Sequence, residues 1–183
     1  MFTQSDQKLI AKALNGNKSA WLKLVKRYEK QVYNYALRMV SNPDDALDLM
    51  QDTFVAVCRN LSGFRGDASF KSWLLKIAHY RCIEFYRRKK PTVDFDEVPE
   101  AYEQTDEFCP ELAMVVDQQN VELIKAMSEL PVNQRSVIEM KFFQFLTFED
   151  IAVQLGISSN TVKSRLYAGL SKMKQVLEVA DAN

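Results

Sequence analysis

The chain has 183 residues and no net formal charge, with 47% hydrophobic and 26% charged residues, a globular composition for one ordinary domain or two small ones. It contains no apolar stretch of the roughly 18 residues that a membrane span needs, and its N-terminus, MFTQSDQKLI, does not resemble a signal peptide, so we expect a cytoplasmic protein. The three cysteines are spaced for neither a disulfide framework nor a zinc site, and we expect no metal and no cofactor.

Helical spacing of apolar residues dominates the chain, which has only five glycines and five prolines. We therefore expect an all-α fold. The first clear helix covers residues 20–40, where apolar side chains recur at the spacing of one helical face. That face consists of Leu24, Tyr28, Val32, Tyr35 and Met39.

A second helix is predicted to begin at Asn42. Asn42 can cap it, Pro43 fits the first helical position because no N–H is needed there, and Asp44 and Asp45 face the positive end of the helix dipole. The predicted apolar face is Leu47, Met50, Phe54, Val57 and Leu61. An acidic, polar face lies beside it and comprises Asp44, Asp45, Asp48, Gln51 and Asp52.

Residues 61–69 contain two glycines and are predicted to form a loop that leads into a third helix, residues 70–90. The core face of this helix is Phe70, Leu74, Ile77 and Ala78. Other rings and cations lie off that face, at Trp73, Lys76, Tyr80, Arg81 and Tyr86, and the helix ends in Arg87, Arg88, Lys89 and Lys90. Terminal cations alone are as typical of an ordinary helix C-terminus as of a nucleic-acid-binding surface. Together with the aromatic rings they favour binding to single-stranded nucleic acid.

Charge is divided sharply along the chain. Residues 1–90 hold 17 Lys and Arg against 8 Asp and Glu, a net charge of +9, whereas residues 91–130 hold 1 against 11, a net charge of −10. The stretch 91–111 has three prolines and no cation, which predicts an extended or disordered acidic linker. The basic part is then expected to face a polyanion.

The strongest local motif is FEDIAVQLGISSNTVKSRLYAGL, residues 148–170. Its apolar residues can hold two short helices at a wide angle, Gly156 can end the first helix, and Ser158 or Ser159 can cap the second. This pattern predicts a helix-turn-helix rather than a plain αα-hairpin, since the second helix is polar and cationic. The expected DNA-binding residues are Ser158, Ser159, Asn160, Thr161, Lys163, Ser164, Arg165 and Tyr167.

Three stretches in this order give the chain a family resemblance. They are DALDLMQDTF at 45–54, FRGDASFKSWLLKIA at 64–78 followed by RRKK at 87–90, and LPVNQRSVIEMKF with FEDIAVQLGISSNTVKSRL at 130–166. On these motifs the sequence resembles the extracytoplasmic-function group of bacterial RNA polymerase sigma factors. The resemblance implies two small helical domains, residues 1–91 and 112–183, joined by a flexible acidic linker over 92–111.

The resemblance also implies partners. The first domain would bind the clamp coiled coil of the largest polymerase subunit and open the −10 element, and the second would bind duplex −35 DNA. Polymerase contacts would fall on Asp45, Asp48, Gln51 and Asp52. Contacts to −10 DNA would fall on Phe64, Arg65, Ser69, Trp73, Lys76, Tyr80, Arg87 and Arg88, with the loop 61–69 capturing a flipped base. For regulation the family implies an anti-sigma factor, often anchored in the membrane, and the acidic linker could imitate nascent RNA or serve as a plain tether.

The chain differs from the usual family pattern at several positions. It has Tyr80 and Glu84 where the family usually has Asn and Asp, Phe145 in place of a Gly, and residues 168–170 read Ala-Gly-Leu instead of Arg-Ala-Arg. Two other classes of function compete with the sigma factor. A self-sufficient DNA-binding regulator would bind its operator without polymerase. An enzyme is not expected, because the chain has one histidine and no glycine-rich phosphate loop.

Overall fold

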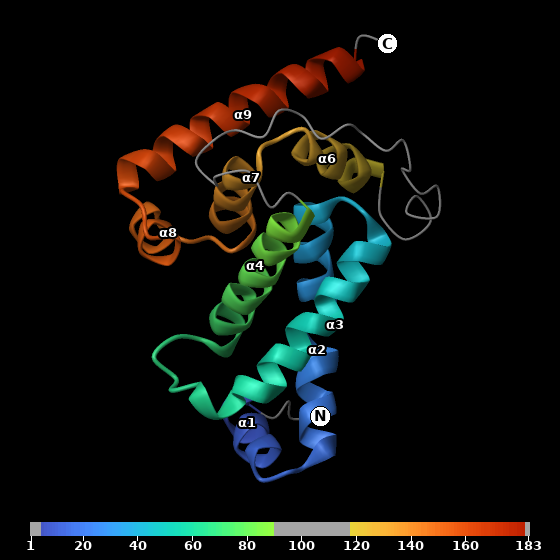
Figure 1. Cartoon of the computed structure of the whole chain (residues 1–183), viewed down its shortest axis with the longest axis vertical. Coiled ribbons are helices and arrows are strands. Elements are labelled where there is room, and N and C mark those ends of the chain that lie inside the picture. Colours follow the sequence, from blue (N-terminus) through green and yellow to red (C-terminus); the bar gives the residue numbers. More distant parts are fainter. Residues whose placement is uncertain (1–4, 90–117, 182–183) are drawn as a thin grey trace.

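A computed structural model describes residues 5–89 and 118–181 of the chain (Figure 1). Its elements are α1 (Asp6–Leu14), α2 (Lys18–Val40), α3 (Pro43–Asn60), the short 3₁₀ turn η1 (Leu61–Gly63), α4 (Phe70–Lys89), α6 (Gln118–Ser128), α7 (Val132–Ile138), the π-helical turn η2 (Glu139–Phe143), α8 (Phe148–Leu155) and α9 (Ser159–Asp181). Within those two ranges there is no strand, and the all-α prediction is confirmed. The predicted acidic linker lies outside the described residues.

The N-terminal half of the structure consists of α1 to α4. The predicted face of α2 is buried along its whole length, from Leu24 to Met39. Helices α1, α3 and α4 pack on α2, and Asp6 on α1 accepts hydrogen bonds from Arg27 and Tyr28 on α2. None of the described helices has the length and apolarity that crossing a membrane requires.

The start of α3 follows the sequence prediction, but its buried face does not follow it fully. The Asn42 side-chain oxygen accepts hydrogen bonds from the backbone N–H groups of Asp44 and Asp45, at 2.9 and 3.0 Å, and caps the helix. Leu47 was predicted in the core but its side chain is 43% exposed, whereas Leu49 is buried. The buried face is centred on Ala46, Leu49 and Thr53, because α2 and α4 cover that side of the helix.

The single histidine of the chain belongs to the core of this half. His79 on α4 is 4% exposed, and its Nδ1 lies 3.0 Å from the hydroxyl oxygen of Tyr35 on α2. Burial lowers the pKa of His79 to about 4. The imidazole is therefore neutral at pH 7, and its role is to satisfy a buried hydroxyl group between two helices.

The C-terminal half contains the predicted helix-turn-helix. Thr147 and Asp150 form a capping box at the start of α8, and Gly156 ends that helix with a φ of 68°. The Ser158 hydroxyl accepts the Thr161 N–H at 3.0 Å and so caps α9. Helix α9 then continues far beyond the predicted motif, and it crosses α7 closely at Gly169, where a Cβ would lie 2.9 Å from the Ile138 side chain.

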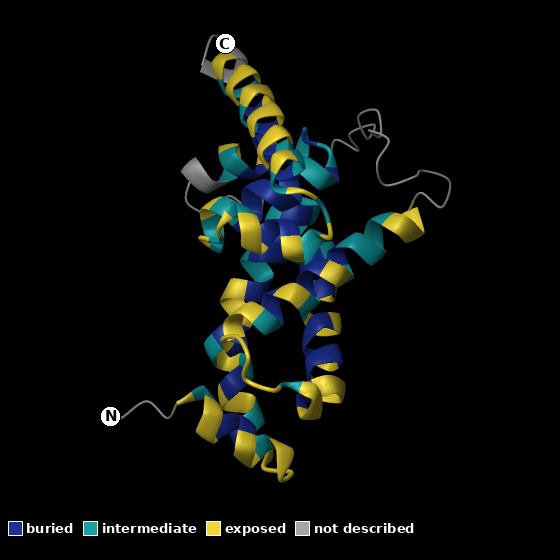
Figure 2. Cartoon of the chain, turned by 90° about the vertical axis from the view of Figure 1, so that its left-hand side faces the viewer, coloured by how far each residue is buried: buried dark blue, intermediate teal, exposed yellow. Residues whose placement is uncertain are grey.

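The two halves touch directly. Buried residues lie inside each half and also where the halves meet (Figure 2). Ile124 on α6 and Val132 on α7 are 5% and 8% exposed, and both pack into the hydrophobic cluster of the N-terminal half. The rest of the C-terminal half forms a second cluster that runs from Ala126 to Met173. The contact between the halves is therefore partly apolar and well packed.

Candidate nucleic-acid interface

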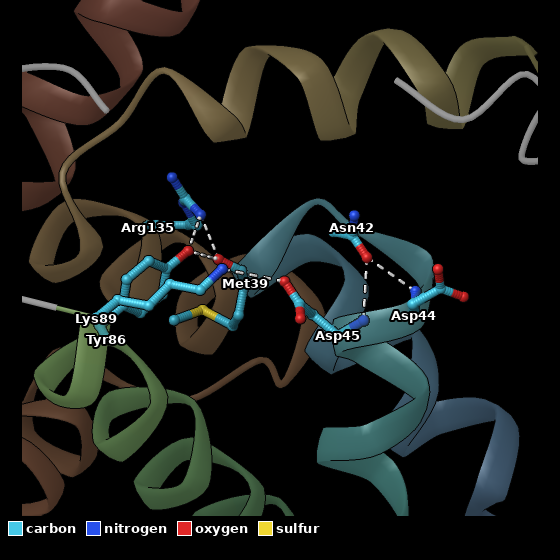
Figure 3. A network of polar contacts seen from close by, with 7 residues as sticks. All are labelled: Met39, Asn42, Asp44, Asp45, Tyr86, Lys89 and Arg135. Atoms are coloured by element: carbon cyan, nitrogen blue, oxygen red, sulfur yellow. Dashed lines mark hydrogen bonds and ion pairs between the residues drawn. The ribbon is translucent and has the colours of Figure 1, made fainter. Parts of the chain in front are cut away.

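The last turn of α4 carries the cations predicted to meet DNA. Arg87, Arg88 and Lys89 are all exposed, and Lys90 lies outside the described residues. Arg88 donates to Glu84 at 2.9 Å, and this hydrogen bond is the main reason that the pKa of Glu84 is lowered. Lys89 reaches across to Asp45 on α3 at 3.3 Å (Figure 3). The cationic end of α4 is thus partly paired with carboxylates of its own chain.

The aromatic residues predicted at the −10 surface divide into exposed and packed rings. Tyr80 is 54% exposed, and its ring is available to a partner. Trp73 and Phe64 pack on each other with ring centroids 5.3 Å apart, and both also contact the buried ring of Phe70. The Tyr86 hydroxyl donates to the Met39 carbonyl at 2.6 Å. The N-terminal half is therefore stabilised in part by contacts of Phe64, Trp73 and Tyr86.

The loop at 61–69 is exposed apart from Leu61, which is buried, and Phe64, which is half-buried. Ser69 caps α4, since its hydroxyl oxygen accepts the Ser72 N–H at 3.1 Å. Arg65 and Asp67 are 84% and 74% exposed and form an ion pair at 3.1 Å, an arrangement that contributes little to stability in water. The Arg65 guanidinium can consequently exchange this partner for a phosphate at small cost.

The acidic face of α3 and the cationic end of α4 share one cleft. The cleft has a volume of about 200 Å³ and is lined by Asp45, Asp48, Leu49, Asp52, Arg81, Glu84, Phe85 and Arg88. Asp48 and Asp52 are exposed, and Gln51 lies exposed beside them. The structure thus brings together the residues predicted for polymerase and part of those predicted for −10 DNA.

The helix-turn-helix presents its second helix to solvent. Asn160, Lys163, Ser164 and Tyr167 are exposed, with Tyr167 at 65%. The Lys163 ammonium lies 5.5 Å from the centroid of the Phe148 ring, which places its charge above the start of α8. The hydroxyls of Ser158 and Thr161 are 2.9 Å apart, so both are already engaged in capping, and Ser159 and Arg165 are half-buried. The DNA-facing roles of these residues stay predictions.

Three charged residues that the sequence analysis did not select form a contact between the halves. They are Arg38 on α2, Arg135 on α7 and Glu139 at the start of η2, and Arg135 and Glu139 are buried. A signal was present in the sequence, because Glu139 stands within the apolar run VIEMKFF and a charge in such a run needs a buried partner. The sequence could not identify that partner, which lies 101 positions away.

Comparison with known proteins agrees with this architecture. The family model described as Sigma-70 region 2 matches residues 24–92, and the model described as Sigma-70, region 4 matches residues 120–173. Two solved structures have the same fold: CnrH in complex with the cytosolic domain of CnrY, with a TM-score of 0.66, and the sigma factor RpoE in complex with the anti-sigma factor NepR from Bartonella quintana, with a TM-score of 0.60. Each is 23% identical to this chain; they cover 96% and 86% of it, over 99% and 96% of their own lengths.

Curated relatives match over nearly the whole chain. RNA polymerase sigma factor SigV of Bacillus subtilis is 31% identical over 84% of this chain and 89% of its own length. ECF RNA polymerase sigma factor SigM of Mycobacterium tuberculosis is 30% identical over 95% of this chain and 85% of its own length. The RNA polymerase sigma-H factor of Pseudomonas aeruginosa is 28% identical over 97% of both chains. With its two matched regions and these relatives, the chain belongs to the extracytoplasmic-function group of RNA polymerase sigma factors.

Proposed function

We propose that this sigma factor gives core RNA polymerase its promoter specificity through two separate surfaces. The N-terminal half, residues 1–91, binds the polymerase clamp coiled coil and the opened −10 element. The helix-turn-helix half, residues 112–183, binds the duplex −35 element, and residues 92–111 connect them. The observation that carries this proposal is the shared cleft, where Asp48 and Asp52 face out beside the cations of α4.

Recognition of the −10 element is proposed to combine charge with stacking. Arg65, Lys76, Arg87 and Arg88 are cationic and exposed, which suits the backbone of a separated strand. The exposed Tyr80 ring can stack on a base, a contact worth roughly 1–3 kcal/mol. Because an extruded base costs a few kcal/mol of stacking and pairing, the N-terminal half must bind the flipped state to keep the duplex open.

Recognition of the −35 element is proposed to occur at the start of α9. A second helix of this motif enters the major groove with its first residues on base edges. Asn160 and Ser164 have the hydrogen-bonding groups for base edges, and Lys163 supplies a phosphate contact. The protein acts by binding alone, in the cytoplasm, while the polymerase forms the phosphodiester bonds.

Transcription from purified components tests the function directly. Core polymerase with this chain is expected to initiate RNA synthesis on a subset of a promoter library, and core polymerase without it is not. Should initiation fail on every template, the proposed function is wrong. Tight binding of the free chain to a duplex operator would instead favour a self-sufficient regulator, which is the competing function.

The polymerase surface can be tested separately. Replacement of both Asp48→Arg and Asp52→Arg is expected to abolish binding to core polymerase, because two exposed carboxylates become cations. Glu29→Arg is the matched control, since Glu29 is an exposed carboxylate on α2 away from the cleft. Unchanged binding by the double variant, with a native circular dichroism spectrum, would remove these carboxylates from the interface.

An anti-sigma partner is part of the proposal. The support is that two proteins of the same fold were solved as complexes, one with the cytosolic domain of CnrY and one with the anti-sigma factor NepR. A protein that covers both halves of this chain would block polymerase and DNA together. We expect this chain to co-purify with the product of a neighbouring gene. Addition of that partner protein to the transcription reaction is expected to stop transcription.

A further inference from the structure

Arg38 and Glu139 form an ion pair that joins the two halves of the chain. The Arg38 Nε donates to one Glu139 carboxylate oxygen at 2.6 Å and its Nη2 donates to the other at 2.9 Å. The side chains are 17% and 1% exposed, so the pair is almost fully removed from water. The Arg38 guanidinium also lies 4.0 Å from the centroid of the Phe143 ring. Although Arg38 belongs to α2, its guanidinium is therefore held by a carboxylate and a ring of the C-terminal half.

Arg135 makes a second connection next to this pair. Its Nη2 donates to the carbonyls of Ser128 and Leu130, at 2.7 and 2.9 Å, within its own half. Its Nη1 donates to the Met39 carbonyl at the end of α2 and to the Tyr86 hydroxyl on α4, the latter at 2.8 Å (Figure 3). One guanidinium thus satisfies carbonyls near the C-termini of helices from both halves, which would otherwise lack partners.

The closed arrangement is too short for a promoter. The −10 and −35 elements are named for positions about 25 base pairs apart, and at about 3.4 Å per base pair these positions lie about 85 Å apart along the duplex. In the closed chain, a series of contacts links Lys163, a proposed −35 contact, to Arg88, a proposed −10 contact. It follows α9 from Lys163 to Gly169, which lies against Gln134. Arg135, next to Gln134, then contacts Tyr86, two residues before Arg88. Helical rise and side-chain lengths limit this path to roughly 40 Å, less than half of the required span.

We propose that the Arg38–Glu139 pair is the latch of a closed, inactive arrangement of this sigma factor, and that the pair must break before both promoter elements can be bound. The proposal rests on the proposed function. The physical basis is that a buried pair holds only while both partners are present, since loss of one leaves an uncompensated charge out of water. Opening exposes Glu139 and Arg38 to water and frees the halves to separate.

Two variants separate the latch from a general loss of stability. Arg38→Met leaves Glu139 unpaired in the closed state and is expected to open the chain. Arg38→Met combined with Glu139→Met replaces the ion pair by an apolar pair of similar volume, which commonly preserves such a contact, and is expected to close it again. Arg59→Met is the matched control, because Arg59 is an exposed arginine near the end of α3.

Small-angle scattering of the full chain measures closure. The wild type and the Arg59→Met control are expected near a radius of gyration of about 16 Å, and Arg38→Met is expected to be larger by about 5 Å or more. The double variant returns to the wild-type value. A compact Arg38→Met chain, or a wild type that is already extended, would overturn the latch. If Arg38→Met loses its helical circular dichroism, Glu139→Gln approaches the same pair from the other half and must give the same expansion.

Binding to a promoter that carries both elements, in the presence of core polymerase, measures inhibition. Arg38→Met is expected to bind this promoter about tenfold tighter than the wild type, because the fraction of the chain that can reach both elements is no longer small, and the double variant is expected to match the wild type. Expansion without tighter binding would show that the contact is not inhibitory and would overturn the proposal. If Arg38→Met expands but the wild-type chain supports initiation at no promoter, the proposed function is wrong, while the pair is still the contact that holds the halves together.

Discussion

Acidification is predicted to weaken the N-terminal half through one residue, His79. Its imidazole is 4% exposed between α2 and α4, and burial lowers its pKa from 6.5 to about 4. In the unfolded chain the same group takes up a proton near its ordinary pKa of about 6.5. Between these two values the unfolded state binds more protons than the native state, so stability is fully present above pH 6.5 and is lost as the pH falls toward 4.

The size of this effect follows from the shift. Each pKa unit corresponds to about 1.4 kcal/mol, so a shift from 6.5 to about 4 gives a loss of about 3 kcal/mol between pH 7 and pH 4. A domain of this size has a free energy of unfolding of roughly 5–15 kcal/mol, of which this is a large part. Carboxylates also titrate in this range. Comparison of the wild type with a variant that lacks the imidazole removes their contribution.

Urea unfolding followed by tryptophan fluorescence measures the effect. Both tryptophans of the chain, Trp21 and Trp73, lie in the N-terminal half, so their signal reports the half that contains His79. His79→Gln cannot take up a proton in this range and can keep a hydrogen bond to Tyr35. The wild type is expected to lose about 3 kcal/mol more than His79→Gln between pH 7 and pH 4. Parallel losses in the two proteins would refute the assignment.

Three further predictions concern the C-terminal half. Lys163→Ala is expected to weaken −35 binding on all sequences and to reduce the slope of log affinity against log salt by about 0.9, whereas an unaltered slope in a filter-binding titration would remove Lys163 from the phosphate contacts. Phe145→Gly is expected to stabilise this half by about 0.5–1 kcal/mol in thermal unfolding, because Phe145 is 84% exposed with a φ of 58° and glycine adopts that conformation without strain; a lower melting temperature would show that the ring contributes packing. Thr147→Ala is expected to cost about 1 kcal/mol in urea unfolding through loss of the α8 capping box, while Thr147→Ser, which retains the hydroxyl, is expected to cost less.

The sequence predicted the local structure well where one residue dictates it. Asn42 and Pro43 start α3, Gly156 ends α8 with a positive φ, and Ser158 caps α9. These features depend on backbone geometry and on hydrogen bonds across three or four residues, which a short motif contains in full. Phe145, where the resemblance expects a glycine, has a φ of 58°, a conformation that strains a residue with a side chain.

The long-range contacts were not predictable in the same way. Leu47 was assigned to the core of α3 in place of Leu49. Periodicity identifies an apolar face, but it does not show which edge of that face the neighbouring helices cover. The Arg38–Glu139 pair joins residues 101 positions apart, and no local pattern states which buried charge meets which. The residues of the shared cleft came from two separate motifs, and only the packing of α3 on α4 brings those motifs together.

The ion pair between Lys89 and Asp45 makes the two proposed ligands of this protein depend on each other. Under the proposed function, a polymerase cation that pairs with Asp45 would release the Lys89 ammonium, which would then attract the DNA strand more strongly. The Lys89 side chain is 50% exposed, so the exchange is worth less than about 1 kcal/mol, or at most about fivefold in affinity. The free protein would therefore bind single-stranded DNA slightly more weakly than the protein bound to polymerase.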